Sequence, residues 1–259
     1  MKDTDTITVY WAPANYTIED DTWEMLYASP QSLSSMIRKL RKPNALPQSI
    51  YSCPGYKDSV DNVFVFTSAI DDEVKIPTQT LEELDLIDPN KFPLQGIPLP
   101  TSNLPVSLYM QRPSSFDGYH SVNYNMGWIL FADEPIVAKF TSPYFPPVAP
   151  AEGALLATGQ FDIGSWYRPF NLDYHIPVGT EKLVFKEDDP LFYVEFYTTK
   201  KVVVKRYVYT KQLQNLSREL VESPTRYGKF KSLVEKYKAV KKTSILEMIL
   251  SEIQKNVLE

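Results

Sequence analysis

Short runs of alternating apolar and polar residues dominate the first 210 positions and predict β-strands. The clearest early examples are residues 6–11 (TITVYW) and 62–69 (NVFVFTSA), in which successive side chains point to opposite faces of an extended chain. Further strand patterns occupy residues 127–140, with a turn at 133–135, and then 155–161, 171–175, 182–185, 191–197 and 201–209. No helical pattern separates these later runs. The sequence therefore predicts a mainly β fold, either an antiparallel β-sandwich or a jelly-roll or cupin-like barrel.

Proline interrupts this β pattern in two places. Residues 74–113 contain seven prolines, which predict a long surface loop with an edge strand at 106–110. Residues 142–150 contain four more and predict an irregular crossover. Before these stretches, a short helix is predicted to open at Ser29-Pro30 and to end at Pro43 and Pro47, with Leu33, Met36, Ile37 and Leu40 at helical spacing. Residues 50–54 have the pattern of a short buried strand that includes Cys53.

The period of the apolar residues becomes helical from about residue 211. We therefore divide the chain into an antiparallel β domain, residues 1–210, and a helical tail, residues 211–259. The first tail helix is expected to end at Ser223-Pro224. The last begins at Thr243 or Ser244, and its apolar stripe comprises Ile245, Leu246, Ile249, Leu250, Ile253 and Val257. An isolated helix of this length is marginal in water, so another surface must cover the stripe. We expect that surface in the same subunit or in a neighbouring one and favour the neighbour, which predicts a homo-oligomer.

The charge of the tail is opposite to that of the body. Residues 200–259 hold 14 Lys and Arg against 6 Asp and Glu, a net charge of +8, whereas the first 199 residues hold 13 basic and 26 acidic residues. A basic arm for nucleic acid is one interpretation. The basic residues are spread along helices and the overall pI is about 5.3, so we prefer a solvated tail that rests on an acidic body and expect no nucleic-acid partner.

Composition excludes several classes of protein. The chain has 259 residues, of which 43% are hydrophobic and 23% charged, as in ordinary globular proteins. A single cysteine, Cys53, rules out an intrachain disulfide and every multi-cysteine metal site, and we expect its side chain to be small and buried. The first ten residues are acidic and polar, unlike a signal peptide, and no apolar run is long enough to span a membrane.

Few residues form a pattern that indicates catalysis. His120 and His175 are the two histidines, and neither has a second histidine two residues away, as an iron site on a β-barrel usually requires. Runs of acids, such as 71–73 and 187–189, fall at predicted turns, where adjacent carboxylates point to solvent; clustered oxygens of one such loop suit calcium better than they suit a glycosidase. We expect neither a cofactor nor a metal.

The most distinctive segment is residues 161–169 (FDIGSWYRP), with an acid, two large aromatic residues and an arginine around a glycine turn. As a binding surface, Trp166 and Tyr167 stack on sugars or bases, and Arg168 grips a carboxylate or phosphate. As a structural element, Asp162 pairs with Arg168, and Trp166 is a buried plug. We favour the structural role slightly. The binding candidates are thus Asp162, Trp166, Tyr167, Arg168, His175 and His120.

The order of several short motifs resembles an uncharacterised protein family of tailed phages, notably T4-like phages of marine cyanobacteria, with distant bacterial relatives of unknown function. The motifs are Tyr10-Trp11, Cys53-Pro54, residues 62–68, Gly127-Trp128, residues 161–169 and Lys205-Arg206-Tyr207. The resemblance covers about residues 7–210. It implies a viral origin and a location in the host cytoplasm or the virion, and it assigns no catalytic residue.

Two functional hypotheses remain from the sequence. The first is a phage-encoded, non-catalytic binding or structural accessory protein whose partner is another copy, or another phage or host protein. The second is an enzyme on a cupin-like barrel that uses a metal or a pair of carboxylates. Whether the chain is an enzyme stays open at this stage.

Overall fold

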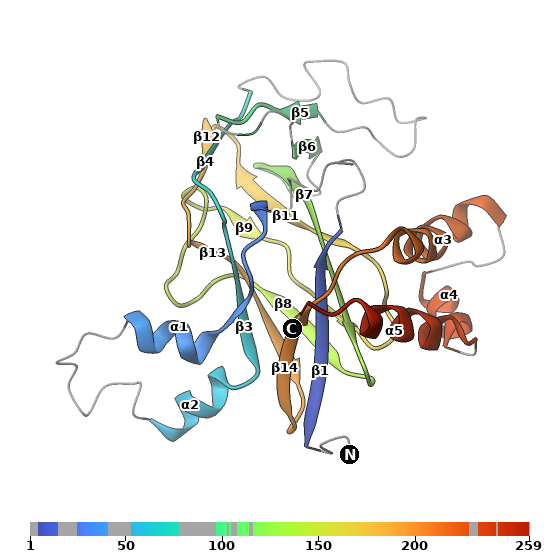
Figure 1. The fold of residues 1–259 in the computed structure, drawn as a ribbon. Coiled ribbons are helices and arrows are strands. Elements are labelled where there is room, and N and C mark those ends of the chain that lie inside the picture. The colour runs from blue at the N-terminus through green and yellow to red at the C-terminus, as the bar shows by residue number, and fades with distance from the viewer. Residues whose placement is uncertain are drawn as a thin grey trace.

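The chain folds into β-sheets with helices on both outer sides (Figure 1). The structure is a computed structural model, and it describes residues 5–14, 25–40, 53–77, 97–102, 104, 108–113, 116–227, 233–241 and 243–258. Its strands are β1 (Thr6–Pro13), β2 (Gln31–Ser32), β3 (Val63–Thr67), β4 (Asp72–Lys75), β5 (Ile97–Leu99), β6 (Tyr109–Pro113), β7 (Tyr119–Ala132), β8 (Val137–Thr141), β9 (Leu155–Leu156), β10 (Gly159–Asp162), β11 (Phe170–Pro177), β12 (Lys182–Phe185), β13 (Pro190–Tyr197) and β14 (Lys201–Arg206). Its helices are α1 (Leu33–Leu40), α2 (Pro54–Val60), α3 (Lys211–Tyr227), α4 (Leu233–Val240) and α5 (Ile245–Lys255).

Two large sheets and one small one account for the strands of the described residues. The first has seven strands in the order β14-β1-β7-β11-β9, with β6 beside β7 and β5 beside β6. The second has five strands in the order β10-β8-β13-β3-β2, and β12 pairs with β4 in the third. All pairs between these strands are antiparallel except β1 with β14, which is parallel. The predicted mainly β fold with a C-terminal helical extension is confirmed.

The two large sheets pack face to face through aromatic side chains, as in a sandwich. Trp11 of β1 meets Phe66 of β3 edge-on at 6.1 Å between ring centroids, and Phe66 stacks on Phe192 of β13 at 4.6 Å. Trp128 of β7 meets the same Phe192 at 5.2 Å. Each such pair contributes about 0.5–1.5 kcal/mol beyond the area it buries.

Asn62 fastens the two large sheets to each other at one end. Strands β13 and β14 follow each other in the chain but belong to different sheets, so the chain crosses over between them. The Asn62 amide donates to the carbonyl of Lys200 at 2.8 Å and accepts from the N–H of Val202 at 3.0 Å. Asn62 has a φ of 56°, a left-handed conformation that asparagine tolerates better than most residues.

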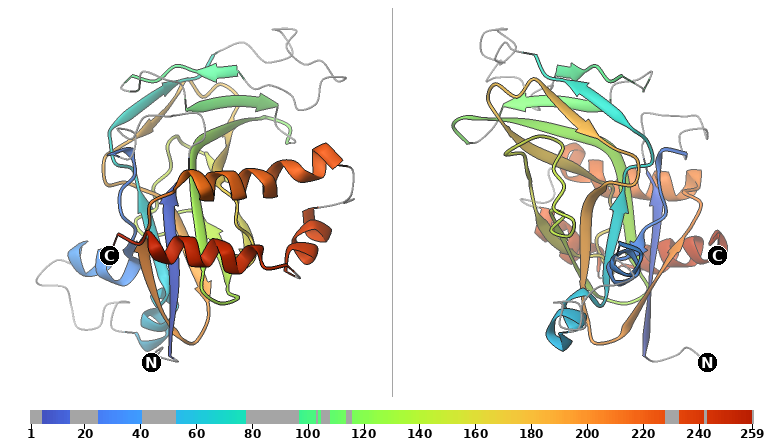
Figure 2. Two further views of the ribbon diagram at one scale, coloured as in Figure 1. Left: turned by 45° about the vertical axis from the view of Figure 1, so that its right-hand side comes forward. Right: turned by 90° about the vertical axis from the view of Figure 1, so that its left-hand side faces the viewer.

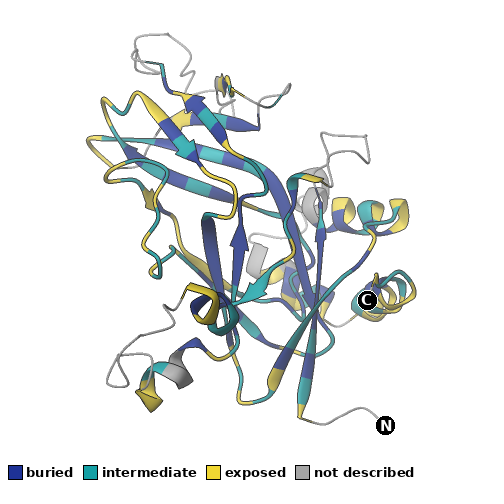
Figure 3. Cartoon of the chain, turned by 60° about the vertical axis from the view of Figure 1, so that its left-hand side comes forward, coloured by how far each residue is buried: buried dark blue, intermediate teal, exposed yellow. Residues whose placement is uncertain are grey.

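Helices cover the outer faces of both large sheets (Figure 2). Leu33 and Met36 of α1 lie in one buried cluster with Val65 of β3 and Tyr193 of β13. On the other side, the tail helices pack on β1 and β7, in a cluster that includes Tyr10, Ile129, Phe131, Leu213, Ile249 and Ile253. Most strand positions are accordingly buried or intermediate, whereas the helices carry more exposed positions (Figure 3).

The tail lies on its own body. Ile249 and Ile253, in the middle of the predicted stripe, are fully buried against the sheet of the same chain. The Lys241 ammonium pairs with Asp162 at 2.7 Å, so a basic residue of the tail does meet an acid of the body. The preference for a neighbouring subunit as the cover of this stripe is wrong, and the stripe no longer argues for self-association. No helix within the described ranges combines the length and the apolar character that crossing a membrane requires.

Two local predictions are wrong. Helix α3 does not stop at Ser223-Pro224 but continues to Tyr227, since a proline this near a helix end removes one backbone hydrogen bond and leaves few turns to disrupt. Cys53 is exposed and directly precedes helix α2, in which Pro54 takes a first-turn position that proline suits. The other residues of the expected strand, 50–52, lie outside the described residues.

The proline-rich stretch 74–113 differs in part from the predicted surface loop. Its described parts form β5, β6 and the second half of β4, and Leu99, Leu108 and Tyr109 lie in the main core with less than 3% of their surface exposed. The predicted edge strand at 106–110 corresponds to β6, which begins at Tyr109 and pairs with β7. Residues 78–96, where most of the loop was expected, lie outside the described residues.

Candidate functional site

A pocket of about 240 Å³ lies between the proline-rich crossover, residues 142–150, and residues of strands β9, β11, β12 and β13. Most of its wall is apolar. The residues that line it are Ser142, Pro143, Pro147, Val148, Ala149, Pro150, Ala154, Leu155, Leu156, Tyr174, Val184, Phe185, Asp189, Pro190 and Leu191. Several of these residues are prolines of the crossover. Proline fixes its own backbone angle φ, so it stabilises an irregular segment that has no strand partner. This preformed apolar wall makes the pocket the main candidate for a ligand site.

The pocket lining contains two ionisable residues, Tyr174 and Asp189. The hydroxyl of Tyr174 donates to the carbonyl of Leu191 at 3.5 Å, and burial raises the pKa of this tyrosine far above its usual range, so it stays protonated. Burial also raises the pKa of Asp189, and the nearby carboxylate of Asp71 adds to the rise, whereas a hydrogen bond with the backbone of Lys186 opposes it. The pocket therefore presents one carboxyl group whose charged form is disfavoured.

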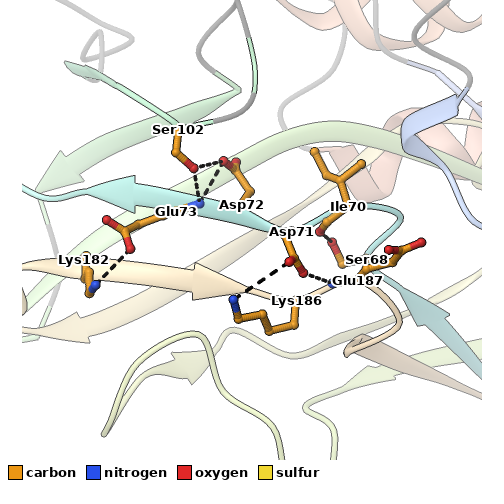
Figure 4. Close-up of polar contacts among 9 residues, drawn as sticks. All are labelled: Ser68, Ile70, Asp71, Asp72, Glu73, Ser102, Lys182, Lys186 and Glu187. Atoms are coloured by element: carbon orange, nitrogen blue, oxygen red, sulfur yellow. Dashed lines mark hydrogen bonds and ion pairs between the residues drawn. The ribbon is translucent and has the colours of Figure 1, made fainter.

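Hydrogen bonds between two acid-rich segments hold the turn that carries Asp189 (Figure 4). The Asp71 carboxylate accepts from the N–H of Glu187 at 2.8 Å and lies 4.0 Å from the Lys186 ammonium. Backbone bonds of 2.9 Å run from Ser68 N–H to the Asp189 carbonyl and from Asp188 N–H to the Ser68 carbonyl. The acids of the two runs thus join the strands that flank the pocket.

The expectation that runs of acids point to solvent holds for Glu187 and Asp188, which are exposed, but it is wrong for the run 71–73, whose side chains form contacts within the protein. Glu73 pairs with Lys182 at 2.9 Å, and that hydrogen bond lowers the pKa of Glu73 (Figure 4). Ser102 links to the Asp72 carboxylate at 3.5 Å and accepts from the N–H of Glu73 at 3.1 Å. Among the described residues, no group of three or more His, Cys, Asp or Glu has the arrangement of a metal site.

Asp162 organises the turn of the distinctive segment, although not through Arg168. Its carboxylate accepts from the backbone N–H groups of Ile136 at 3.2 Å and Gly164 at 3.0 Å, and from the Ser165 hydroxyl at 3.1 Å. Its cationic partner is Lys241. The predicted Asp162–Arg168 pair is wrong, because the guanidinium of Arg168 lies over the ring of Trp166 at 6.0 Å instead.

Tyr167, and not Trp166 as the sequence suggested, is the fully buried aromatic residue of this segment. The indole ring of Trp166 is only half-buried and stacks between Phe161 at 5.4 Å and Tyr237 of α4 at 4.2 Å. Phe161, Tyr237 and the Arg168 guanidinium therefore all lie against the indole ring, which makes Trp166 part of the packing between the body and α4. Tyr167 is the fully buried plug, and its hydroxyl lies 3.3 Å from that of Tyr207. The segment therefore joins the tail to the body.

His120 and His175 do not converge. In the antiparallel pair β7–β11, His120 is opposite Ile176, and His175 is opposite Ser121. Since neighbouring residues of a strand point to opposite faces, the two imidazoles lie on different sides of the sheet and cannot share a metal ion. Burial lowers the pKa of His120, and His175 meets the ring of Phe116 edge-on at 5.0 Å.

The sequence-based prediction missed the pocket residues. Four of them are prolines, at 143, 147, 150 and 190, which in the sequence indicated only irregular structure. The wall forms where the crossover meets strands far away in the chain, and this meeting leaves no local signal.

Comparison of the chain with models of protein families, with curated proteins and with solved structures gives no match.

Proposed function

We propose that this chain is a non-catalytic binding protein and that its pocket accepts a small, uncharged, apolar group. The apolar wall of the pocket is the observation that supports this proposal. Each Å² of apolar surface that binding removes from water stabilises the complex by about 25 cal/mol. A pocket of this size suits a small molecule or one large side chain of a partner protein.

The polar groups of the pocket favour binding over catalysis. General acid–base chemistry uses groups that gain and lose a proton near the working pH. Tyr174 is far from that condition, because burial raises its pKa and its hydroxyl donates to a backbone carbonyl. The histidines lie on opposite faces of the sheet, so they do not form an acid–base pair.

One observation favours the alternative, a carboxylate-dependent enzyme. Burial and the neighbouring Asp71 raise the pKa of Asp189 at the pocket, as a general acid requires. The two hypotheses differ in what Asp189→Asn does. Binding of a neutral apolar probe persists or improves in this variant if the pocket is a binding site alone, whereas an enzyme loses turnover of its substrate.

The biological setting is part of the same proposal. The resemblance to tailed-phage proteins supports a phage-encoded accessory protein of the host cytoplasm or the virion, and the pocket gives it a place to receive part of another phage or host protein. Because the apolar stripe of the tail is used within the chain, the proposal needs no second copy.

A fluorescence titration with N-phenylnaphthylamine, a neutral apolar dye, tests the pocket. Ala149 is exposed and lines the pocket, so Ala149→Trp adds a large ring to the pocket wall without disturbing the core. We expect wild type to bind the dye, and Ala149→Trp to bind it at least about tenfold more weakly, which is a loss of about 1.4 kcal/mol. The matched control is Ala157→Trp, at an exposed alanine outside the pocket. Failure of wild type to bind, or equal binding by Ala149→Trp, contradicts the proposal.

A further inference from the structure

One face of the larger sheet is lined with short polar side chains where it extends beyond the tail helices. Side chains alternate along a strand, so the neighbours of the core residues Val122, Tyr124, Leu172 and Tyr174 point away from the core. These neighbours are Ser121, Asn123 and Asn125 of β7, and Asn171, Asp173 and His175 of β11, which we call the polar face. Ser121 is opposite His175 and Asn123 is opposite Asp173 in the strand register.

The composition of the polar face is unfavourable for a β-sheet. Asparagine and aspartate are depleted in strands, and four of them occupy adjacent positions here. Both strands are internal, since β6 flanks β7 and β9 flanks β11. Further along β7 the same outer face carries Ile129 and Phe131, which the tail covers. Such a departure from local preference is typical of a functional site.

The polar groups of this face are held in place by each other. The Ser121 hydroxyl donates to Asp173 Oδ1 at 2.6 Å, and the Asn171 amide donates to Asn125 Oδ1 at 3.1 Å. Ser121 is only 5% exposed, so the Asp173 carboxylate is held by a hydrogen bond from a buried residue. The side-chain oxygen of Asn123 is buried, and no donor reaches it within the described part of the chain.

An exposed aromatic ring borders the polar face. Phe116 is 59% exposed, and its ring meets the imidazole of His175 edge-on at 5.0 Å. Planar amides and a carboxylate bind pairs of neighbouring hydroxyls, because each offers fixed donor and acceptor positions. A nearby aromatic ring packs on the C–H face of a sugar ring.

We propose that the polar face is a carbohydrate-binding surface. Asp173 accepts hydrogen bonds from sugar hydroxyls, Asn123 and Asn171 bind neighbouring hydroxyls, and Phe116 packs on the pyranose ring. The proposal is independent of the apolar pocket, because no residue of the polar face lines that pocket, and Tyr174, which does line it, points to the opposite side of β11 from Asp173 and His175.

A printed array of oligosaccharides, followed by calorimetric titration of the glycan that is retained best, tests the proposal. Asp173→Asn keeps an oxygen that accepts from Ser121 and removes the charge, so it preserves the local structure. We expect Asp173→Asn and the double variant Asn125→Ala/Asn171→Ala to bind at least about tenfold more weakly than wild type. Gln160→Ala, at an exposed amide on β10, is the control and binds as wild type.

Two tryptophan variants separate this surface from the pocket. The N–H of Ala157 donates to the Asp173 carbonyl at 2.8 Å, which places Ala157 beside the polar face. We expect Ala157→Trp to abolish glycan binding and retain the dye, and Ala149→Trp to do the reverse. The proposal is overturned if wild type retains no glycan on the array, or if Asp173→Asn binds the retained glycan as tightly as wild type.

Discussion

At the scale of residues, Trp166 and Tyr167 show where the sequence stops being informative. Alternation says that two adjacent side chains point to opposite sides, but it does not say which side is the core. The larger indole was the natural choice for the plug, yet the structure buries Tyr167 completely and leaves Trp166 half-exposed under Tyr237. The tail decides this outcome, because α4 supplies the ring that covers Trp166.

Truncation of these two residues is expected to have unequal effects. Tyr167→Ala removes a fully buried ring and leaves a cavity, so it should lower the free energy of unfolding by about 3–5 kcal/mol. Trp166→Ala should cost clearly less, because part of its ring already contacts water. Chemical denaturation measures both, and Tyr167→Phe, which removes only the hydroxyl near Tyr207, is the control at about 1 kcal/mol. A larger loss for Trp166→Ala than for Tyr167→Ala would restore the original assignment.

Asp189 gives the fold a pH dependence with a defined sign. Its folded-state pKa is raised, so the folded protein holds this proton more tightly than the unfolded chain does. Stability from this group is complete below the ordinary aspartate pKa of about 3.9 and falls as pH rises through the raised value. We expect Asp189→Asn to unfold at higher urea concentration than wild type near neutral pH, and to lose this advantage near pH 3. An advantage of equal size at both pH values contradicts the assignment.

At the scale of elements, period-two patterning predicted the strands well, because half of each strand faces a core and the other half does not. Strands β3, β11, β12, β13 and β14 lie where the alternation placed them. The pattern was less informative where pairing with a distant strand, and not alternation, determines that a segment is extended. The two-residue strand β2 is too short to show alternation, and the predicted strand 155–161 is divided into β9 and β10, which belong to different sheets. Strands β5 and β6 of the proline-rich stretch enter the sheet because β6 pairs with β7.

The turn after β10 depends on the absence of a side chain at Gly164. A Cβ there would lie 2.5 Å from the Glu134 carbonyl oxygen and 2.8 Å from Pro135 Cα, and both are backbone atoms that cannot move aside. We expect Gly164→Ala to destabilise the protein by about 1–3 kcal/mol in thermal or chemical unfolding. Gly159→Ala is the matched control, since its Cβ would meet Phe161 at an ordinary 3.7 Å. Equal stability of the two variants would show that the turn does not pack as described.

At the scale of the whole molecule, the sequence predicted a β body and a helical tail but not how they combine. The tail helices cover the outer side of β1 and β7, and Leu258, near the end of the chain, donates its N–H to the carbonyl of Arg206 at 2.8 Å. Contacts between residues this far apart in the chain leave no periodic signal. The same is true of the candidate sites, because the pocket and the polar face each form where separate strands meet.

Integration of the tail into the core has a direct consequence for stability. Ile253→Ala should lower the free energy of unfolding by about 2–5 kcal/mol, because this side chain is fully buried against the body. Met248→Ala, on the same helix but 48% exposed, should have little effect. If Ile253→Ala unfolds like wild type and instead changes the mass of the particle in solution, the stripe is covered by another subunit.

The claim that the pocket is a binding site can be tested most directly by backbone amide NMR spectra of the full chain during titration with N-phenylnaphthylamine. We predict that the largest shifts belong to amides around the pocket, such as those of Leu156, Val184 and Leu191, and that amides of α5 do not move. The same titration of Ala149→Trp should leave the pocket amides unshifted. Shifts that are absent, or that centre on the tail or the polar face, would contradict the claim.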